Sequence, residues 1–298
     1  MKKFLLKTAL FFLALAIVDQ AVGRVFGYMG THAKGGYAGH HHYVTDLTHE
    51  DILIFGSSRA IHHYNPAILE DSLGLTCYNC GQDGNGIVLF YGQYQMIRER
   101  YKPKMIIYDI ASGFDLFQGE SNQKYLGWLR NDYDRKSIKE LFWAVDSTER
   151  YKMQSQMYRY NSKFLQYVTD YVHPIFGIDG NGFLPLKGDL DQLKIRKNRK
   201  DYRQRSIDPQ KQRLLKQIIE DTRHDGVRLV FAVSPSWYGI PMEEVQPIAE
   251  LCRASQIEFI DYSNRPKYVH HAEYFKDGTH MNAHGADEYT RDIVSLLK

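Results

Sequence analysis

Five short apolar runs constrain the fold of this chain more than any other feature of its sequence. They are rich in Ile, Val, Leu, Phe and Tyr and show little strict alternation with polar residues, as expected of strands covered on both faces. The runs are 51–56 (DILIFG), 75–79 (LTCYN), 104–110 (KMIIYDI), 227–235 (VRLVFAVSP) and 257–262 (IEFIDY). We therefore predict a sheet of five buried parallel strands.

Helical patterns separate these runs. The segment 66–73 begins with a proline at a first-turn position, and the segment 208–226 ends on a glycine. Three more helical patterns occupy 86–101, 245–255 and 285–297. Because strand and helix alternate, we predict a three-layer α/β/α fold with right-handed crossovers.

One long region interrupts this alternation. Residues from about 115 to 205 are polar and aromatic-rich, with helical patterns such as LGWLRNDYDRKSIKELFWAV and no good strand. The region follows the third strand and precedes the fourth, so it leaves the sheet at the carboxyl ends of strands, where open α/β sheets bind ligands. We predict a helical insertion that acts as a lid or shapes a substrate site.

The N-terminus has the order of an export signal. Lys2, Lys3 and Lys7 come first, and an apolar run follows that Asp19 interrupts. We interpret residues 1–29 as an uncleaved signal anchor, a transmembrane helix that keeps its lysines inside and leaves the catalytic domain outside the cytoplasm. Residues 30–50 then form a Gly- and His-rich linker, and residues 51–298 form the main domain with its insertion.

Composition excludes some partners and cofactors. The formal net charge is +3, with 38 Lys and Arg against 35 Asp and Glu, and gives no reason to expect nucleic acid. The basic stretch 194–205 fits a solvated surface segment. His40, His41 and His42 are adjacent in the linker, so they do not face one ion from a regular element, and we predict no metal and no cofactor.

The cysteines indicate no redox site. Cys77 and Cys80 have C-x-x-C spacing, but they fall at the end of a predicted strand, where residues three apart point to opposite faces. With Cys252 they make only three thiols, so thiolates alone form no zinc quartet. We expect buried free thiols.

Two short motifs carry the chemistry. Gly56-Ser57-Ser58 ends the first predicted strand, and such a turn places a serine hydroxyl and its own backbone N–H in the ligand crevice. Asp277 and His280 stand before the last helix, at the same edge of the sheet. A serine nucleophile needs a base, and the base needs a group that orients it, so the motifs together predict a hydrolytic triad.

These residues resemble the blocks of the SGNH/GDSL hydrolase superfamily, whose fold is a flavodoxin-like sheet. The resemblance implies Ser58 as nucleophile and Asp277-Gly278-Thr279-His280 as the block that supplies acid and base. It also implies that the backbone N–H of Gly84, in NCGQDGNG, joins that of Ser58 in an oxyanion hole. The resemblance covers the sheet strands, about two-thirds of the chain.

The sequence departs from the family at the third block. Gly-x-Asn-Asp is expected after the third strand, but YDIASGFD has Ser112 or Gly113 near the asparagine position. A missing oxyanion donor typically costs about 3 kcal/mol of transition-state stabilisation, so we expect either a replacement or weak activity. Asn85, Arg59 and Ser57 are the candidates for replacement.

Neighbouring residues suggest a substrate site. The residues assigned to catalysis also fit purely structural roles. Trp237 and Tyr238 follow the fourth strand and fit platforms for a sugar or an acyl chain, and His62 and His63 fit the lining of the crevice. Ser57 and Ser58 also fit helix caps, and Asp277 fits a cap of the last helix or its turn. His280 also fits a surface position, and His284 lies close enough in sequence to compete with it as the base.

The serine block, the membrane helix and the helical insertion together resemble the membrane-anchored branch of the superfamily, which includes the D-alanyl-transfer protein of teichoic acid synthesis and polysaccharide O-acetyltransferases. The resemblance implies an esterase or O-acyltransferase that acts on exported or cell-surface glycans or lipids. Two alternatives remain open. One is an inactive protein of the same fold that binds glycans or assists envelope assembly, and the other is a metal-dependent enzyme that uses the His-rich linker.

Overall fold

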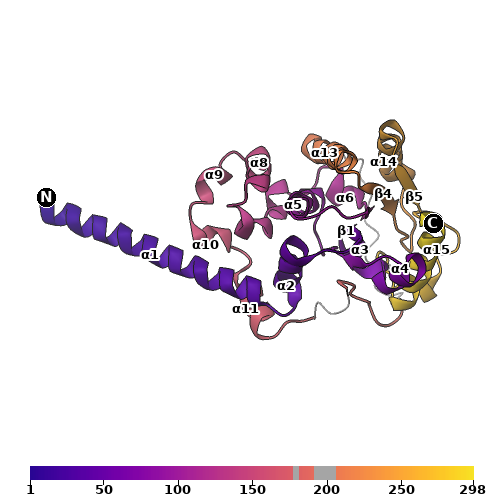
Figure 1. The fold of residues 1–298 in the computed structure, drawn as a ribbon, viewed down its shortest axis with the longest axis horizontal. Coiled ribbons are helices and arrows are strands. Elements are labelled where there is room, and N and C mark those ends of the chain that lie inside the picture. Colours follow the sequence, from indigo (N-terminus) through magenta and orange to yellow (C-terminus); the bar gives the residue numbers. More distant parts are fainter. Residues whose placement is uncertain (177–180, 191–205) are drawn as a thin grey trace. The chain divides into compact units, whose positions relative to one another are not determined.

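The computed structural model describes residues 1–176, 181–190 and 206–298. The chain forms two compact units, each built from two separate stretches of sequence. Unit 1 comprises residues 1–46 and 121–178, and unit 2 comprises residues 47–120 and 179–298. Figure 1 shows the elements of both units under the labels used below.

Unit 2 contains a five-stranded, all-parallel sheet in the order β2-β1-β3-β4-β5. This is the flavodoxin-like order, and it confirms the predicted fold class. Each predicted apolar run contains one strand: β1 (Ile52–Gly56), β2 (Cys77–Asn79), β3 (Met105–Asp109), β4 (Arg228–Val233) and β5 (Glu258–Asp261).

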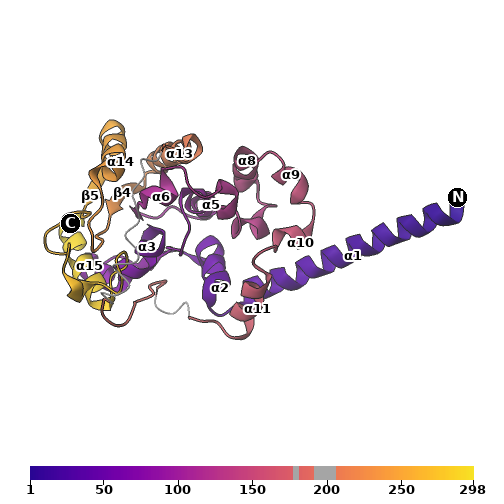
Figure 2. The ribbon, with the colours of Figure 1, turned by 180° about the vertical axis from the view of Figure 1, so that it is seen from behind.

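Helices cover both faces of this sheet, as Figures 1 and 2 show from opposite sides. One face carries α5 (Ile87–Ile97), α6 (Ser112–Asp115), α13 (Pro209–Asp225) and α14 (Met242–Ser255). The other carries α3 (Ser58–His63), α4 (Pro66–Leu73) and α15 (Ala283–Leu297), with the 3₁₀ turn η3 (Ala272–Tyr274) beside α15. The three layers therefore form as the sequence predicts.

The core follows the two-residue period of the strands. Ile54 and its register partner Ile107 belong to the cluster that includes residues of α15. Their neighbours Phe55 and Tyr108 point the other way, and both rings pack against Phe90 of α5 at 6.0 and 5.7 Å between centroids. Because both faces are buried, most positions of these strands carry apolar residues, which is why the strands could be recognised in the sequence.

The three cysteines lie in this core as free thiols, as expected. Burial raises the pKa of the Cys77 and Cys80 thiols well above the usual value, and nearby glutamates raise it further. These cysteines therefore stay protonated and unreactive at neutral pH.

Helices are the regular secondary structure of unit 1 within its described residues. Its first stretch holds α1 (Lys2–His32), α2 (Gly36–His42) and the start of a π-helix, η1 (Tyr43–Leu47). Its second stretch holds α7 (Asn122–Tyr125), the 3₁₀ helix η2 (Leu129–Asp132), α8 (Lys136–Val145), α9 (Glu149–Lys152), α10 (Gln156–Arg159) and α11 (Phe164–Val172). The predicted insertion is thus helical in this part, while its residues 191–205, with the basic stretch 194–205, lie outside the described residues.

Helix α1 is longer than the predicted anchor. One helix of the described chain, Lys2–His32, is long and apolar enough to cross a membrane, and its most apolar stretch is not buried in the protein. Its carboxyl-terminal part packs within unit 1: a Cβ on Gly23 would lie 2.6 Å from Gln156, and one on Gly30 would lie 2.7 Å from Tyr167. Glycines here allow α10 and α11 to approach α1 closely.

Residues 30–50 differ from the flexible linker that we predicted, because most of them are helical. Gly and His have low helix propensity, which favoured the linker interpretation, but tertiary contacts override propensity here. The backbone N–H of Ala38 donates to Asp170 at 2.8 Å, and His41 Nε2 lies 2.9 Å from Asp132. His42 pairs with Asp46 at 3.1 Å, so these two neighbouring histidines each bond to a different aspartate.

Candidate active site at the carboxyl edge of the sheet

The turn after β1 determines where Ser58 lies. Gly56 has φ of +141°, and a Cβ there would lie 2.5 Å from the carbonyl oxygen of Asp109 and 2.9 Å from Ala60. Only glycine fits this conformation and this space. The chain therefore turns sharply from β1 into α3, and Ser58 becomes the first residue of that helix at the carboxyl edge of the sheet.

Three predicted site residues form a continuous row of hydrogen bonds. His280 Nε2 lies 2.7 Å from Ser58 Oγ, and His280 Nδ1 lies 2.9 Å from Asp277 Oδ2. With Nδ1–H donating to the carboxylate, Nε2 is free to accept the serine hydroxyl proton. Ser58 follows the first strand, and His280 and Asp277 lie near the end of the chain. The fold thus brings together residues more than 200 positions apart.

A tight turn holds the acidic end of this row. Asp277 Oδ1 accepts the backbone N–H groups of Thr279 and His280 at 2.8 and 2.9 Å. The turn closes through an antiparallel bridge between Phe275 and Met281. Gly278 lies at its tip, where a Cβ would come within 2.8 Å of the Tyr238 ring. These contacts explain why Asp277 and His280 are three residues apart in a glycine-containing turn.

The carboxyl of Asp277 is ionised over the useful pH range. Burial on its own raises the pKa of this carboxyl, but the hydrogen bond and charge of His280 and the N–H groups of Thr279 and His280 outweigh burial and lower the pKa to about 2. The Asp277 side chain is 46% exposed. Asp277 therefore presents a fixed negative charge to the imidazole.

The structure separates Ser58 and His280 from their sequence neighbours. Ser57 is 1% exposed, whereas Ser58 is partly exposed and bonded to the imidazole. His284 stacks on Tyr274, with 5.4 Å between ring centroids. The ambiguity between His280 and His284 as partner of the serine is thus removed by geometry.

The backbone N–H groups of Ser58 and Gly84 have no hydrogen-bond acceptor in the part of the chain that the structure describes. Gly84 has φ of +64°, and a Cβ there would meet nothing within 4 Å. Gly84 thus combines a left-handed backbone, which suits glycine, with open space beside it. Its role in an oxyanion hole stays a prediction.

The candidates for a replacement donor differ in how fully their side chains are engaged. The Arg59 guanidinium pairs with Asp109 at 3.2 Å and donates to the carbonyl oxygens of Ile110 at 2.5 Å and Ser234 at 3.3 Å. Its side chain therefore points into the sheet edge. Asn85 Nδ2 donates to the Asp83 carbonyl at 2.8 Å, and an amide nitrogen carries a second hydrogen.

The loop after β3 is held by other residues where the family resemblance leads us to expect asparagine. The hydroxyl of Ser112 donates to the carboxylate of Glu244. Asp115 is fully buried and accepts from Tyr108 Oη at 2.6 Å and from the Ala111 N–H at 2.7 Å. Burial raises the pKa of Asp115 to about 6 despite these bonds. The Lys211 ammonium, also buried, donates to the Phe117 carbonyl at 2.8 Å.

The predicted substrate residues lie near the row in different ways. The Tyr238 ring packs on Gly278, and the backbone N–H of Trp237 donates to the Gly278 carbonyl at 3.3 Å. The ring of His62 lies 5.6 Å from that of His280. Both His62 nitrogens are engaged, Nδ1 with the Leu184 carbonyl at 2.7 Å and Nε2 with Asp83 at 3.1 Å. Burial lowers the pKa of His62, but these partners outweigh it and raise the pKa overall.

His63 is a site residue whose role the sequence did not reveal. Its ring is fully buried, and its Nε2 accepts the backbone N–H of Met281 at 3.0 Å, directly after His280. Its Nδ1 lies 3.0 Å from Ser234 Oγ. Burial, with the charges of His280 and Arg59, holds the pKa of His63 well below its usual range. A neutral His63 thus links the nucleophile helix to the turn that carries the base.

A buried polar network below the nucleophile was also missed. Asp109, at the end of β3, is fully buried and accepts from Tyr64 Oη at 2.7 Å and from the Ser234 N–H at 3.2 Å, besides its pair with Arg59. Tyr64 in turn bonds to Tyr289 of α15 at 3.0 Å. Burial raises the pKa of Asp109, while Arg59 and the hydrogen bonds oppose this change. The network ties α3 to the ends of β3 and β4 and to the last helix.

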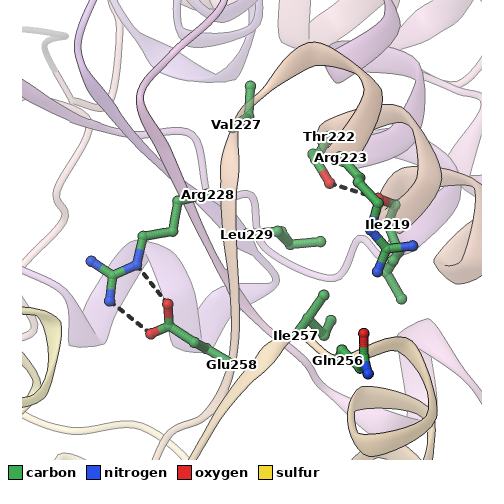
Figure 3. A pocket seen from close by; sticks show the side chains of 9 residues that line it. All are labelled: Ile219, Thr222, Arg223, Val227, Arg228, Leu229, Gln256, Ile257 and Glu258. Carbon is green, nitrogen blue, oxygen red and sulfur yellow. Dashed lines mark hydrogen bonds and ion pairs between the residues drawn. The ribbon is translucent and has the colours of Figure 1, made fainter.

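A shallow hollow lies at the opposite edge of the sheet (Figure 3). It is lined by the first residues of β4 and β5 and by the end of α13, with an exposed ion pair between Arg228 and Glu258 at 2.6 Å. Ser58 lies at the carboxyl end of the strands, so this hollow is no part of the candidate active site.

Comparison with known proteins gives distant structural likenesses only. No family model matches the chain, and no curated protein sequence matches it. A solved structure assigned to the G-D-S-L lipolytic family, from Desulfitobacterium hafniense DCB-2, is 9% identical with a TM-score of 0.42 and covers 82% of this chain and 98% of its own. An acetyl xylan esterase is 12% identical with a TM-score of 0.41, covering 83% of this chain and 100% of its own.

A GDSL-like lipase from Bacteroides thetaiotaomicron VPI-5482 is 8% identical with a TM-score of 0.37 and covers 83% of this chain and 88% of its own. Likeness at this level carries no argument about activity. The chemistry of this chain must be argued from its own residues.

Proposed function

We propose that this chain is a membrane-anchored serine esterase or O-acyltransferase of the SGNH type. The observation that carries the proposal is the row of Ser58, His280 and Asp277, with 2.7 and 2.9 Å between successive partners at the carboxyl edge of a flavodoxin-like sheet. A serine hydroxyl has too high a pKa to react unaided, and this row supplies the base and its orienting carboxylate.

The geometry supports a two-step acyl transfer. Ser58 Oγ attacks the ester carbonyl as its proton passes to His280 Nε2, and the N–H groups of Ser58 and Gly84 bind the oxyanion. The C–O bond to the alcohol then breaks, and His280 returns the proton to the leaving oxygen. Water or a sugar hydroxyl attacks the acyl-serine in the same manner and frees Ser58, so the acceptor decides between hydrolysis and transfer.

The substrate class follows from the anchor and from the aromatic residues beside the site. Helix α1 has the composition of a membrane anchor, and its basic amino end favours the cytoplasmic side, which leaves the rest of the chain outside. Trp237 and Tyr238 lie beside the Gly278 turn and suit a sugar ring or an acyl chain, and His62 lies beside His280. We therefore propose acyl esters of exported glycans or lipids as substrates.

A fluorophosphonate probe tests the activated serine directly. We expect the full chain, in mild detergent, to be labelled, and we expect Ser58→Ala and His280→Ala to abolish labelling. Ser57→Ala and His284→Ala are matched controls, since each neighbours a proposed catalytic residue without a place in the hydrogen-bonded row. A folded wild-type chain that is not labelled would contradict the proposal.

One observation favours a second candidate, a glycan-binding or envelope-assembly protein that has lost activity. The loop after β3 supplies a serine bonded to Glu244 where the family resemblance implies an oxyanion donor. This alternative predicts no labelling and a polysaccharide affinity that survives Ser58→Ala. Labelling that depends on both Ser58 and His280 would exclude it.

A further inference from the structure

Helix α11 of unit 1 exposes its apolar side. Its apolar stripe consists of residues that lie within about a third of the helix circumference at 100° per residue. The members and their exposed fractions are Phe164 (49%), Leu165 (66%), Val168 (36%), Tyr171 (38%) and Val172 (58%). A surface helix of a soluble protein normally turns such a stripe toward the core.

Hydrogen bonds fix α11 in this orientation. Its inner side carries Tyr167, which is 4% exposed, and Asp170, which is fully buried. The Asp170 carboxylate accepts the backbone N–H of Ala38 and the side-chain amide of Gln166, each at 2.8 Å. Tyr167 lies against Gly30 of α1. The hydrogen bonds of Asp170 thus hold the inner side of α11, while its apolar stripe faces outward. Such an outer face suits contact with an apolar environment rather than with water.

Helix α1 indicates what covers the stripe. Its segment from Phe4 to Val18, in which Lys7 is the one charged residue, spans about 22 Å at 1.5 Å per residue. This length is short of the roughly 30 Å hydrocarbon core of a bilayer. The next residue, Asp19, is bonded to α10: its carboxylate accepts from Ser155 Oγ at 2.7 Å and from the N–H groups of Gln156 and Met157 at 2.8 Å. The hydrogen bonds between α1 and α10 therefore begin directly where the apolar part of α1 ends.

The stripe lies at a definite level along α1. Tyr28 of α1 contacts Tyr171 of α11, with 6.1 Å between ring centroids, and both tyrosines are partly exposed. Tyr28 follows Val18 by about 15 Å of helix, of which about 8 Å is needed to complete the hydrocarbon span. The contact thus falls in the headgroup layer, where tyrosines are enriched. Figures 1 and 2 show the amino-terminal part of α1 extending free of the other unit 1 helices, with α10 and α11 beside the rest of it.

We propose that the apolar stripe of α11 docks on the lipid bilayer that α1 spans, with its side chains in the boundary between headgroups and acyl chains. The anchor is shorter than the bilayer core, and sinking this face into the interface compensates for the mismatch. The inference rests on the membrane-anchor part of the proposed function and adds a second, lateral membrane contact for unit 1.

Site-specific labelling of the full chain in liposomes tests the docking. The native thiols of Cys77, Cys80 and Cys252 are buried, so a single introduced cysteine takes an environment-sensitive fluorophore selectively. Leu165→Cys places the label on the stripe, and Thr169→Cys places it on an exposed position of the same helix outside the stripe. Phe12→Cys places it in the apolar part of α1. Vesicles of phosphatidylcholine and phosphatidylglycerol, with or without nitroxide on the acyl chains, provide the quencher.

We expect blue-shifted emission and about a twofold loss of fluorescence to nitroxide lipid at Leu165→Cys, and little of either at Thr169→Cys. Equal quenching at the two positions, or none at Leu165→Cys while Phe12→Cys is quenched, would overturn the docking. A blue shift at Leu165→Cys without lipid quenching would assign the stripe to a protein partner or a second copy and would also overturn it. An absence of quenching at Phe12→Cys would instead contradict the membrane anchor, and with it the proposed function.

Phe164→Cys is a second label position on the stripe that leaves Leu165 in place, so the result does not depend on the loss of Leu165. Circular dichroism equal to that of the wild-type chain shows that each labelled variant is folded. Quenching at both stripe positions, with Thr169→Cys protected, is the result that the proposal requires.

Discussion

The two units use buried polar groups in opposite ways. In unit 2, apolar residues fill both sides of the sheet, and the buried charges gather below the nucleophile, where Arg59 and Asp109 pair at 3.2 Å. In unit 1, the buried Asp170 and the half-buried Asp19 join helices to one another, while apolar side chains of α1 and α11 face outward. Unit 2 thus has the buried polar network that the proposed esterase requires, and unit 1 has the outward apolar face that the proposed membrane contact requires.

The polar contacts of the two units have different consequences. The polar network of unit 2 fixes a hydroxyl, an imidazole and a carboxylate within hydrogen-bonding distance, which is the precision that acyl transfer needs. The polar contacts of unit 1 fix helix orientation instead and leave apolar side chains of α1 and α11 exposed. The predictions below test the two halves of the comparison, beginning with the largest expected effect.

Asp277→Asn should lower the rate of fluorophosphonate labelling, or of ester hydrolysis, by about 10⁴-fold. The carboxylate holds Nδ1–H of His280 and stabilises the imidazolium, whereas an amide offers its own N–H and favours the wrong tautomer. Glu273→Gln is the matched control, because Glu273 pairs with His271 at 3.1 Å on the exposed surface and should leave the rate unchanged. A loss of less than tenfold would remove Asp277 from the proposed triad.

Arg59→Met should lower the free energy of unfolding by about 3 to 5 kcal/mol, because it leaves the fully buried Asp109 without its cation. Denaturant titration of the full chain in detergent measures the change. The control Arg228→Met breaks the exposed pair with Glu258 and should cost less than about 1 kcal/mol.

If Arg59→Met and Arg228→Met lower the free energy of unfolding equally, then the pair of Arg59 with Asp109 does not behave as a buried ion pair. The double variant Arg59→Met with Asp109→Leu sharpens the test. Removing both charges should recover part of the lost stability, since no unpaired carboxylate remains.

His63 and His62 should give opposite pH dependences of stability. Burial depresses the pKa of His63 in the folded chain, so its contribution is present above the unfolded value of 6.5 and is lost as pH falls toward the folded pKa. The pKa of His62 is raised, so its contribution is present below 6.5 and is lost as pH rises through the folded pKa. Each contributes a slope of at most about 1.4 kcal/mol per pH unit.

Melting temperatures between pH 5.5 and 7.5, about one unit on either side of the usual histidine pKa, measure these slopes. His63→Gln should make the chain less sensitive to acid than the wild type, and His62→Gln should make it more sensitive. The same sign of change in both variants would contradict the assigned protonation states.

Much of unit 2 could be predicted from sequence, because strands buried on both faces must be apolar throughout and because Gly56 and Gly226 mark tight turns. The pairing of Ser58 with the 277–280 turn followed from the rule that strand ends share one edge. His63 and the Arg59–Asp109 pair could not be found in this way. Their partners are far apart in sequence, and neither a histidine nor an arginine in a short helix carries a local signal of burial.

Unit 1 was harder for a related reason. Its two stretches, 1–46 and 121–178, are separated by half of the sheet, and nothing in either indicates the other. Residues 30–50 are rich in Gly and His, which are weak helix formers, so their helices depend on contacts such as Asp170 with Ala38. The predicted insertion was recognised as helical, but not as the partner of the anchor, and its role as a lid stays a prediction.

The smallest expected effect tests the junction between α1 and α10. Asp19→Ala should lower stability by about 1 kcal/mol, the usual value of a helix cap, because Ser155 and the N–H groups of Gln156 and Met157 lose their acceptor. Faster hydrogen exchange of the Gln156 and Met157 amides measures the loss locally. Asp71→Ala, an exposed position in α4, should change neither stability nor exchange in α10.

The result bears on the fate of the anchor as well as on unit 1. If the Asp19 contacts hold α10, then cleavage after the apolar run at Ala21-Val22-Gly23 would remove both Asp19 and Gly23, against which Gln156 packs. Unit 1 would then lose part of its own interior, so retention of α1 becomes a requirement of folding. If amide hydrogen exchange in α10 is unchanged in Asp19→Ala, then α10 does not depend on its contacts with α1. That result would contradict the inference that unit 1 is built around a membrane helix.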